Sequence, residues 1–405
     1  MSAAPADRGG PDAGQGRGGP RPGEDRPLRI IQAAAFAFPS PQGSQVFVRG
    51  MARALARRGH EVTVLCYGHG LGAPDPEYRV LRTPSLPGYQ RVRAGPDAVK
   101  PLLDLALAAL LAREPADVVH AHNYEAPLAA LLARPWQRAP LVYSAHNTMG
   151  EELPTYFEGE RRRRLARWAG QLLDHAIPRM ADHAIAISAP AVETLRALGC
   201  ARVSLVPPGI KPEDVAPAVP ALLPPGPWVV YAGNPDRYQD LDVLLAAMAQ
   251  VPQARLLLVS ASPLDEWARQ APPGTRCVLT RSFEEVRSLL AASTLAVVPR
   301  SVCSGYPIKL LNSLGMGLPT VIARGSAQGL PGEVVVPDRD PVAMAAAIRA
   351  LLAEPERRAQ LGAEAREHVL AHCTWAARAA DLELLYRTLL EPAQRFAAAS
   401  DRMTL

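Results

Sequence analysis

CSGYPIKLLNSLGMGLP, at residues 303–319, lies between two apolar runs, 294–298 and 320–322, that predict β-strands. The stretch itself predicts a loop that contains Gly305, followed by a short helix and a turn. Strand, glycine-containing loop, helix and strand in this order form one step of an α/β sheet. The stretch therefore predicts an α/β domain.

One face of the predicted helix is polar. Lys309, Asn312 and Ser313 share this face by their i, i+3 and i+4 spacing, and Pro307 suits the first helical position. The free N–H groups and the dipole of a helix N-terminus favour an anion, so a cation, an amide and a hydroxyl there suit a phosphate. A buried helix with a solvated polar side explains the same pattern, and the pattern alone leaves both interpretations open.

Length and composition indicate two globular domains. The 405 residues exceed one ordinary domain, which has about 150–200 residues, and 48% apolar with 20% charged residues supports a sizeable core. Lysines and arginines exceed aspartates and glutamates by 44 − 39 = 5, an excess that allows anionic partners without requiring them. We expect no nucleic-acid partner.

The cysteines and the N-terminal segment indicate where in the cell the protein is located. The five cysteines are odd in number and show no CxxC spacing, which is typical of reduced thiols in a cytosolic protein and not of disulfides or a zinc site. Positions 1–27 are rich in Gly and Pro, so we expect a disordered tail there. No run approaches the roughly 18 apolar residues of a membrane-spanning helix. We therefore expect a cytoplasmic protein.

Strand and helix patterns alternate through residues 28–212, which predicts a first Rossmann-like domain. After its first strand comes a loop with Gly43 and Ser44 that lacks the GxGxxG pattern of dinucleotide sites. This loop is either a ligand contact, because glycine lets backbone N–H groups approach closely, or simply a tight turn.

Three histidines lie where predicted strands of this domain end. His120 and His122 close one strand, and His146 follows another. Ligands bind at the carboxyl ends of strands in open α/β sheets, so the position favours a site role, above all for His146. A lone histidine is more often structural, and that alternative stays open.

The second half repeats the alternation. Residues 213–227 are Pro-rich and aperiodic, which predicts a linker, and residues 228–374 predict a second Rossmann-like domain. In this domain Gly233 and Asn234 follow the first strand. Two doubly wound parallel-sheet domains that face each other would leave a cleft between them.

The segment 160–180 combines five arginines near its start with an apolar stripe. The arginines are Arg161, Arg162, Arg163, Arg164 and Arg167. The apolar residues that recur at helical intervals are Leu165, Trp168, Ala169, Leu172 and Leu173. A basic amphipathic helix with a tryptophan suits an anionic membrane surface, here the inner face of a membrane. A helix packed on its apolar side with solvated arginines is the commoner structure with this pattern.

Eight different short motifs occur along the chain, and their order and spacing are informative although none is specific alone. They are Pro41–Ser44, Gly59–Val64, Asp117–His122, Ser144–Asn147, Val206–Gly209, Tyr231–Gly233, Ser304–Pro319 and Trp375. Together they resemble the retaining glycosyltransferases of family 4, group 1 type, over nearly all of the folded chain. The resemblance implies the GT-B fold of two facing Rossmann-like domains, with the segment 375–405 crossing back as a helix onto the first domain.

The chain departs from that family's Glu-x7-Glu motif. Aligning Gly317–Pro319 with the family's Gly-x-Pro places the two glutamates on Ser304 and Asn312, and neither residue has a carboxylate. In the family the first glutamate contacts the donor sugar and the second contacts the nucleotide ribose, and an amide such as that of Asn312 still both donates and accepts hydrogen bonds. The family's donor-phosphate Arg and Lys fall on Asn234 and Gln239, so these cations are absent as well.

The resemblance implies transfer of a sugar from a nucleotide-diphosphate sugar to an unknown acceptor, lipid-linked or of the cell envelope, with retention of the anomeric configuration. It implies no bound metal or other cofactor. A diphosphate needs positive charge, which Lys309 and Arg300 would supply in place of the missing cations. In related enzymes the histidine at the position of His146 lines the sugar site. We therefore expect His146, Lys309 and Arg300 to be the catalytic residues.

Other residues are expected to bind the two substrates. The expected donor-binding residues are Gly43, Ser44, Gly233, Asn234, Ser304, Gly305, Tyr306 and Asn312, and the expected acceptor-side residues are His122 and Asn147. The alternative is a non-catalytic GT-B-like binding or regulatory partner with a degenerate donor site. The retained His146, the Gly43–Ser44 loop and the polar face at Lys309 favour an enzyme.

Overall fold

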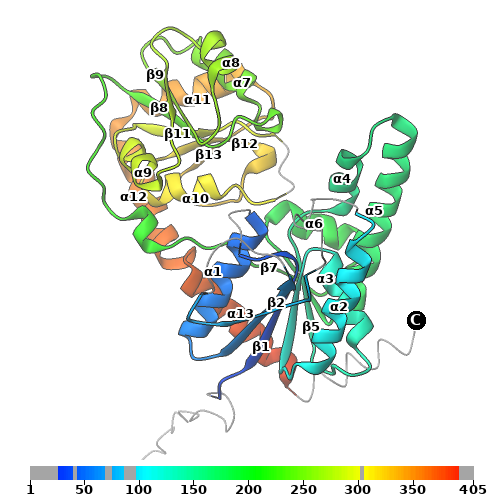
Figure 1. Ribbon diagram of the computed structural model, residues 1–405. Helices are drawn as coiled ribbons and strands as arrows, with labels where there is room; N and C mark the ends of the chain where they lie inside the picture. Colours follow the sequence, from blue (N-terminus) through cyan, green and yellow to red (C-terminus); the bar gives the residue numbers. More distant parts are fainter. Residues whose placement is uncertain (1–25, 40–42, 69–74, 86–96, 302–304, 392–405) are drawn as a thin grey trace, which may run out of the picture.

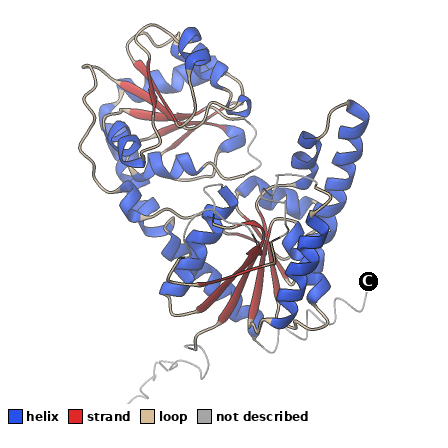
Figure 2. Ribbon diagram, viewed as in Figure 1, coloured by secondary structure: helices blue, strands red, loops and turns tan. Residues whose placement is uncertain are grey.

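The computed structural model describes residues 26–39, 43–68, 75–85, 97–301 and 305–391 (Figure 1). Within these ranges the chain forms two α/β halves, each built on a parallel sheet that helices cover on both faces (Figure 2). The predicted fold class, two doubly wound parallel-sheet domains, is therefore confirmed.

The first sheet has the strand order β3-β2-β1-β4-β5-β6-β7, and all of its pairings are parallel. Its strands are β1 (Arg29–Ala37), β2 (Glu61–Tyr67), β3 (Arg79–Arg82), β4 (Val118–His122), β5 (Leu141–Ala145), β6 (His183–Ala186) and β7 (Val203–Leu205). The helices are α1 (Gly43–Arg57), α2 (Lys100–Arg113), α3 (Glu125–Ala133), α4 (Met149–Glu152), η1 (Leu153–Tyr156), α5 (Glu160–Met180) and α6 (Ala189–Ala197).

The second sheet has the order β10-β9-β8-β11-β12-β13 and is also parallel. Its strands are β8 (Trp228–Ala232), β9 (Arg255–Ser260), β10 (Arg276–Leu279), β11 (Leu295–Val298), β12 (Thr320–Ala323) and β13 (Glu333–Val336). The helices are η2 (Pro212–Val215), η3 (Arg237–Gln239), α7 (Leu241–Met248), α8 (Asp265–Gln270), α9 (Phe283–Ala291), α10 (Ile308–Gly315), η4 (Arg324–Ser326) and α11 (Pro341–Ala353).

Both sheets reverse their strand order at one point, and ligands bind at such points in open α/β sheets. In the first sheet the reversal lies between β1 and β4, and in the second it lies between β8 and β11. The loops that leave β8 and β11 include Gly233 and Arg300. The fold therefore brings the chain's candidate residues to the two places where a ligand is expected.

The central strands are buried on both faces, which explains their continuous apolar sequence. Along β1, Ile31 and Ala33 pack into one hydrophobic cluster, whereas Ile30 and Ala34 pack into the cluster on the opposite face. Gln32 lies between them, and its polar side chain is fully buried. A buried amide of this kind needs hydrogen-bond partners inside the protein.

The chain returns to its first half through α12 (Pro355–His372) and α13 (Trp375–Leu390). Figure 1 shows α13 beside α1 under the first sheet, and Tyr386 of α13 is fully buried in that half's core. At the crossing, Ile210 donates its N–H to the oxygen of Cys373 (2.9 Å), and Trp375 donates its N–H to the oxygen of Ile210 (3.2 Å). Two segments that connect the halves are thus hydrogen-bonded to each other.

The segment after His146 contains two short helices, α4 and η1. The backbone N–H groups of Met149 and Gly150 both donate to the carboxylate of Asp174 on α5, each at 2.8 Å. These groups would otherwise lack partners at the start of α4. The acceptor comes from 24 or more positions further along the chain, so local pattern does not reveal it.

Most of the apolar stripe of α5 is not packed on the protein. Leu173 packs against the core of the first half, but the interpretation of a helix packed on its apolar side is wrong for the larger part of the stripe. The buried side of α5 carries Ala166, Gly170, Asp174 and Ile177, whereas Leu165, Trp168 and Leu172 are exposed by 65%, 62% and 53%. Small residues face the protein because α4 lies very close to α5. Among the described residues, no helix is both long and apolar enough to cross a membrane.

We predict that Gly170→Ala destabilises the protein, although Gly→Ala inside a helix normally stabilises it by about 1 kcal/mol. A methyl group at this position would overlap the backbone oxygen of Met149, which cannot move without disturbing α4. Overpacking of this kind costs about 1–3 kcal/mol in the free energy of unfolding, which urea denaturation measures. The matched control is Gln171→Ala, at the exposed neighbouring position of the same helix. A stability gain at Gly170 would show that the two helices are not in contact as described.

Candidate functional site

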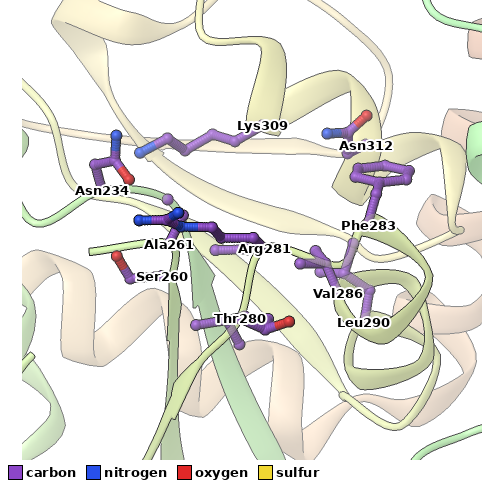
Figure 3. Close-up of a pocket in the computed structure, with 13 residues that line it drawn as sticks. Asn234, Ser260, Ala261, Thr280, Arg281, Phe283, Val286, Leu290, Lys309 and Asn312 are labelled. Carbon is purple, nitrogen blue, oxygen red and sulfur yellow. The ribbon is translucent and has the colours of Figure 1, made fainter. Parts of the chain in front are cut away.

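A pocket of about 230 Å³ lies at the carboxyl edge of the second sheet (Figure 3). Its wall comes from the loops after β8, β9 and β10 and from the helices α9 and α10. The lining residues are Ala232, Gly233, Asn234, Val259, Ser260, Ala261, Thr280, Arg281, Phe283, Val286, Leu290, Lys309 and Asn312. Four residues of the sequence prediction, Gly233, Asn234, Lys309 and Asn312, are thus brought together in one pocket.

Lys309 is held in place by neutral groups of the β8 strand and its loop. Its Nζ donates to the hydroxyl oxygen of Tyr231 at 2.9 Å and to Oε1 of Gln239 at 2.6 Å, and it lies 4.3 Å from the centre of the Tyr231 ring. The Tyr231 hydroxyl in turn donates to the backbone oxygen of Asn234 at 2.6 Å. The lysine therefore has a defined position at the wall of the pocket, and Figure 3 shows it extending toward Asn234.

Glycine at position 233 leaves room for the end of the Lys309 side chain. A Cβ atom there would lie 2.6 Å from Nζ and 2.9 Å from Cε of Lys309, well inside van der Waals contact. Arg300 is not among the residues that line the pocket, and its guanidinium lies 4.9 Å from the centre of the Tyr238 ring. Two cations from the β11–α10 segment thus contact residues of the segment from β8 to α7.

The buried and polar faces of helix α10 differ from the prediction at one position, Ser313. Lys309 and Asn312 line the pocket, but Ser313 is only 5% exposed and packs on the side of Leu310 and Leu314, so its assignment to the polar face is wrong. The helix begins at Ile308, and Pro307 precedes it as the N-cap residue. The polar face that remains is a lysine and an amide one turn apart.

Sequence reasoning missed the opposite wall of the pocket, which Arg281, Phe283 and Val286 supply. The exposed Phe283 ring and the buried Leu290 make this wall apolar, beside the arginine. A local signal was present: Ser282 accepts a hydrogen bond from the N–H of Glu285 at 3.3 Å, and Ser-x-x-Glu marks a helix start. The loop before that helix start lies at the carboxyl end of β10.

The three histidines belong to one buried network in the first half. His122 contacts His146 through Nδ1 and Nε2, 3.0 Å apart, and contacts Gln32 Oε1 through its own Nε2 at 2.6 Å. His120 contacts the Tyr386 hydroxyl through Nδ1 at 2.6 Å and the Ser144 hydroxyl through Nε2 at 2.7 Å. His120 and His122 are fully buried and His146 is 4% exposed. His122 therefore lies beneath His146, and any effect of it on an acceptor would pass through that ring.

Burial keeps these rings neutral. Desolvation lowers the pKa of His120 to about 3 and that of His146 to about 4, and it lowers the pKa of His122 well below its usual value. A neutral imidazole has one N–H donor and one acceptor nitrogen. The direction of each hydrogen bond in the network is therefore linked to the next.

The two halves meet beside His146. A Cβ atom on Gly305 would lie 3.4 Å from Oδ1 of Asn147 and 3.8 Å from the backbone oxygen of His146. Tyr306 packs against hydrophobic clusters of both halves. Asn147 itself donates to Glu152 Oε2 at 2.9 Å. Predicted residues of the donor loop and of the acceptor side are thus neighbours across the two halves.

The remaining predicted residues lie at the start of α1 or outside the described ranges. Gly43 begins that helix, and Ser44 donates its hydroxyl hydrogen to Asn123 Oδ1 at 3.5 Å, beyond the end of β4. Ser304 lies outside the described residues. Among the residues that the structure describes, no three His, Cys, Asp or Glu side chains are grouped to hold a metal ion. The expectation of no cofactor stays a prediction.

We predict that the protein loses stability as the pH falls from 6.5 to 5. The unfolded histidines titrate near 6.5, whereas His120 and His146 stay neutral down to about 3 and 4, so the unfolded chain binds more protons in this window. Each such histidine costs about 2 kcal/mol by pH 5, at about 1.36 kcal/mol per pKa unit. Urea denaturation at several pH values measures this slope, which His120→Gln should reduce and the exposed control His175→Gln should leave unchanged. A free energy of unfolding that is constant over the window would contradict the buried neutral cluster.

Comparison with known proteins agrees with this geometry. Residues 41–214 match the family described as Glycosyltransferase Family 4, and residues 226–354 match Glycosyl transferases group 1. D-inositol 3-phosphate glycosyltransferase 1 of Catenulispora acidiphila is 31% identical over 312 residues, which cover 68% of this chain and 73% of that protein. Phosphatidyl-myo-inositol mannosyltransferase of Mycolicibacterium smegmatis is 25% identical over 389 residues, covering 89% of this chain and 94% of that protein.

Solved structures share the fold at lower identity. Sucrose-phosphate synthase from Thermosynechococcus elongatus aligns with a TM-score of 0.73 and 21% identity, covering 89% of this chain and 99% of that one. HepE of Anabaena, in complex with UDP-glucose, aligns with a TM-score of 0.63 and 14% identity, covering 89% and 100%. Both halves match in the same order that the sequence motifs predict. The chain therefore belongs to the family 4, group 1 glycosyltransferases and has their GT-B fold.

Proposed function

We propose that this glycosyltransferase transfers a sugar from a nucleotide-diphosphate sugar to a hydroxyl-bearing acceptor, with retention of the anomeric configuration. The observation that carries the proposal is the fixed ammonium group of Lys309 in the pocket at the carboxyl edge of the second sheet. A diphosphate leaving group gains negative charge as its bond to the sugar breaks, and a positioned cation stabilises that charge. Arg300 and the N-terminus of α10 add to the same field.

The pairing of Lys309 with Gln239 supports this role. In the family resemblance, a donor-phosphate lysine falls on the position of Gln239, which has no charge here. The Gln239 amide accepts a hydrogen bond from Lys309 instead, so an ammonium group from α10 reaches the same loop. The cation is thus supplied from a different element to the same part of the pocket.

The rest of the pocket suits a nucleoside. Asn312, one turn after Lys309, provides an amide that both donates and accepts, as the two hydroxyls of a ribose require. Phe283 and Val286 offer apolar surface for a base, and Arg281 adds a second positive group at the rim. HepE of Anabaena, which shares the fold, has been solved with UDP-glucose. We infer that the nucleotide of this chain's donor lies along the same edge of the sheet.

We propose that the transfer step takes place between the two halves. Gly305 and His146 are neighbours there, so a sugar attached to a diphosphate near Lys309 would have its ring against His146. The relatives named above act on inositol phosphate or phosphatidyl-inositol according to their names. For this chain we propose an acceptor that is lipid-linked or part of the cell envelope, met in the cytoplasm at the inner membrane face.

The exposed surface of α5 supports a membrane location. Leu165, Trp168 and Leu172 are exposed on a helix that begins with Arg161–Arg164. Figure 1 shows α2, α3 and α5 as neighbouring helices, and α3 contacts both of the others. Helices α2 and α3 also have exposed large apolar side chains, which are Leu102, Leu105, Leu128 and Leu132. Apolar anchors with adjacent arginines are the combination that binds an anionic bilayer surface.

We predict that Lys309→Ala weakens binding of the donor about 10- to 100-fold, because a hydrogen bond to a charged group contributes about 1.5–3 kcal/mol. Calorimetry with a panel of UDP-, GDP- and ADP-sugars measures the Kd, and Lys211→Ala, at an exposed lysine outside the pocket, is the matched control. An unchanged Kd in Lys309→Ala would refute the assigned role.

The same panel separates the two functional alternatives. If no nucleotide sugar binds the wild-type chain, the proposed donor is wrong. Tight binding without transfer or hydrolysis would favour a non-catalytic partner, whose degenerate donor site the absent glutamates at Ser304 and Asn312 would explain. When turnover occurs, NMR of the product reports whether its anomeric configuration equals that of the donor, as retention requires.

We predict that replacing Arg161, Arg164 and Arg167 with glutamine weakens binding to vesicles that contain anionic lipid about 100-fold. Each arginine near such a surface contributes about 1 kcal/mol, so three contribute about 3 kcal/mol. Vesicle sedimentation measures the change. The matched control replaces three exposed arginines of the second half, Arg269, Arg276 and Arg357. Equal binding of the two triple variants would remove α5 as the membrane contact.

A further inference from the structure

Six polar side chains form a buried chain of hydrogen bonds that ends at His146. They come from β1, β4, β5, the segment after β5, and α13, and none is more than 4% exposed. In order along the chain of bonds they are Ser144, His120, Tyr386, Gln32, His122 and His146. Burying so many polar groups is costly unless every donor meets an acceptor. The bonds must therefore agree in direction from one end to the other.

The Gln32 amide sets that direction toward His146. Its oxygen is 2.6 Å from Nε2 of His122, so this nitrogen carries the proton and donates. Nδ1 of the neutral His122 ring is then an acceptor, and Nε2 of His146, 3.0 Å away, must donate to it. His146 consequently carries its proton on Nε2, and its other nitrogen, Nδ1, is an acceptor.

The same amide sets the direction toward Ser144. Gln32 Nε2 donates to the hydroxyl oxygen of Tyr386 at 3.5 Å, and that hydroxyl donates to Nδ1 of His120 at 2.6 Å. His120 then donates from Nε2 to the hydroxyl oxygen of Ser144 at 2.7 Å. Among the described residues, Tyr386 is thus the acceptor of the amide nitrogen, and it comes from the helix that returns from the second half.

We infer that Tyr386 and Gln32 are positioning residues that hold His146 in the Nε2–H tautomer, so that His146 offers an acceptor nitrogen to a hydroxyl group. The hydroxyl belongs to the sugar ring of the donor or to the acceptor, an assignment that rests on the proposed function. A hydroxyl that donates to Nδ1 keeps its oxygen lone pairs for other partners. The opposite tautomer would present an N–H group, which would donate to the oxygen of the hydroxyl instead of accepting its hydrogen.

Removal of the Tyr386 hydroxyl gives a defined change in this network. Without it, the Gln32 amide nitrogen has no acceptor, and a rotation of the amide by 180° places that nitrogen toward His122. His122 would then accept on Nε2 and donate from Nδ1, and His146 would accept on Nε2 and carry its proton on Nδ1. Tyr386→Phe should therefore convert a single tautomer of His146 into a mixture.

Long-range ¹H–¹⁵N NMR of protein labelled at histidine reads the tautomer of each ring directly. The chain has 9 histidines, and the His146→Asn spectrum identifies the signal of His146 by its loss. We expect the Nε2–H form alone in the wild-type protein at pH 7 and both forms in Tyr386→Phe. The matched control is Tyr143→Phe, which removes another buried tyrosine hydroxyl in the same half, outside the network, and should leave His146 unchanged.

A wild-type His146 with its proton on Nδ1 would overturn the inference, and this measurement needs only the assignment variant His146→Asn to fold. An unchanged single tautomer in folded Tyr386→Phe would overturn the role of Tyr386. Where transfer is measurable, Tyr386→Phe should lower kcat about tenfold, the value of one hydrogen bond, with little change in the KM of the donor. If the wild-type tautomer is as stated but no nucleotide sugar binds, the proposed function fails while the positioning role stands.

Discussion

The hydrogen bonds between Ile210 and the segment 373–375 fix how the two halves of the molecule meet. Each half alone brings its loops to the carboxyl edge of its own sheet, because the strands are parallel. The crossing brings these edges together, and Gly305 of one edge lies near Asn147 of the other. The crossing is also linked to the histidine cluster by ring contacts, since Phe47 lies 5.7 Å from Trp375 and 4.9 Å from His146, centre to centre. Any movement of one half on the other therefore bears on the surroundings of His146.

The sequence predicts the fold well because burial on both faces of a parallel strand leaves a strong signal. β1 is read without difficulty from its apolar run, and Lys309 and Asn312 are placed correctly by helical spacing. The prediction fails where the partner is distant in the chain. The N–H groups of α4 are satisfied by Asp174 of α5, and α5 turns small residues inward because α4 lies against it. Neither fact is contained in the local periodicity of the two segments.

The pocket also shows why one missing motif does not decide activity. The two glutamates and the two donor-phosphate cations of the family are absent together, so their loss leaves the local net charge of the site unchanged. Lys309 and Arg281 then give the pocket its positive character, one from α10 and one from the loop after β10. The interaction between two charges depends on the distance between them and not on which helix or loop carries the charged side chain. A diphosphate site is therefore compatible with cations that enter from new positions, provided that their geometry is fixed, as it is for Lys309.

The histidine cluster is a different kind of constraint, because it does not favour stability. Apolar side chains of similar size would fill the space between β1, β4 and α13 without desolvating polar groups, and below pH 6.5 they would also avoid the penalty for keeping the rings neutral. The polar network fixes the direction of each hydrogen bond in it. Because each neutral ring has one donor and one acceptor, the orientation of the Gln32 amide determines, through His122, which nitrogen of His146 carries the proton. Tyr386 anchors the amide from a helix that only the complete two-half fold brings to this sheet. The hydrogen-bonding character of His146 thus depends on the same return of the chain that joins the halves.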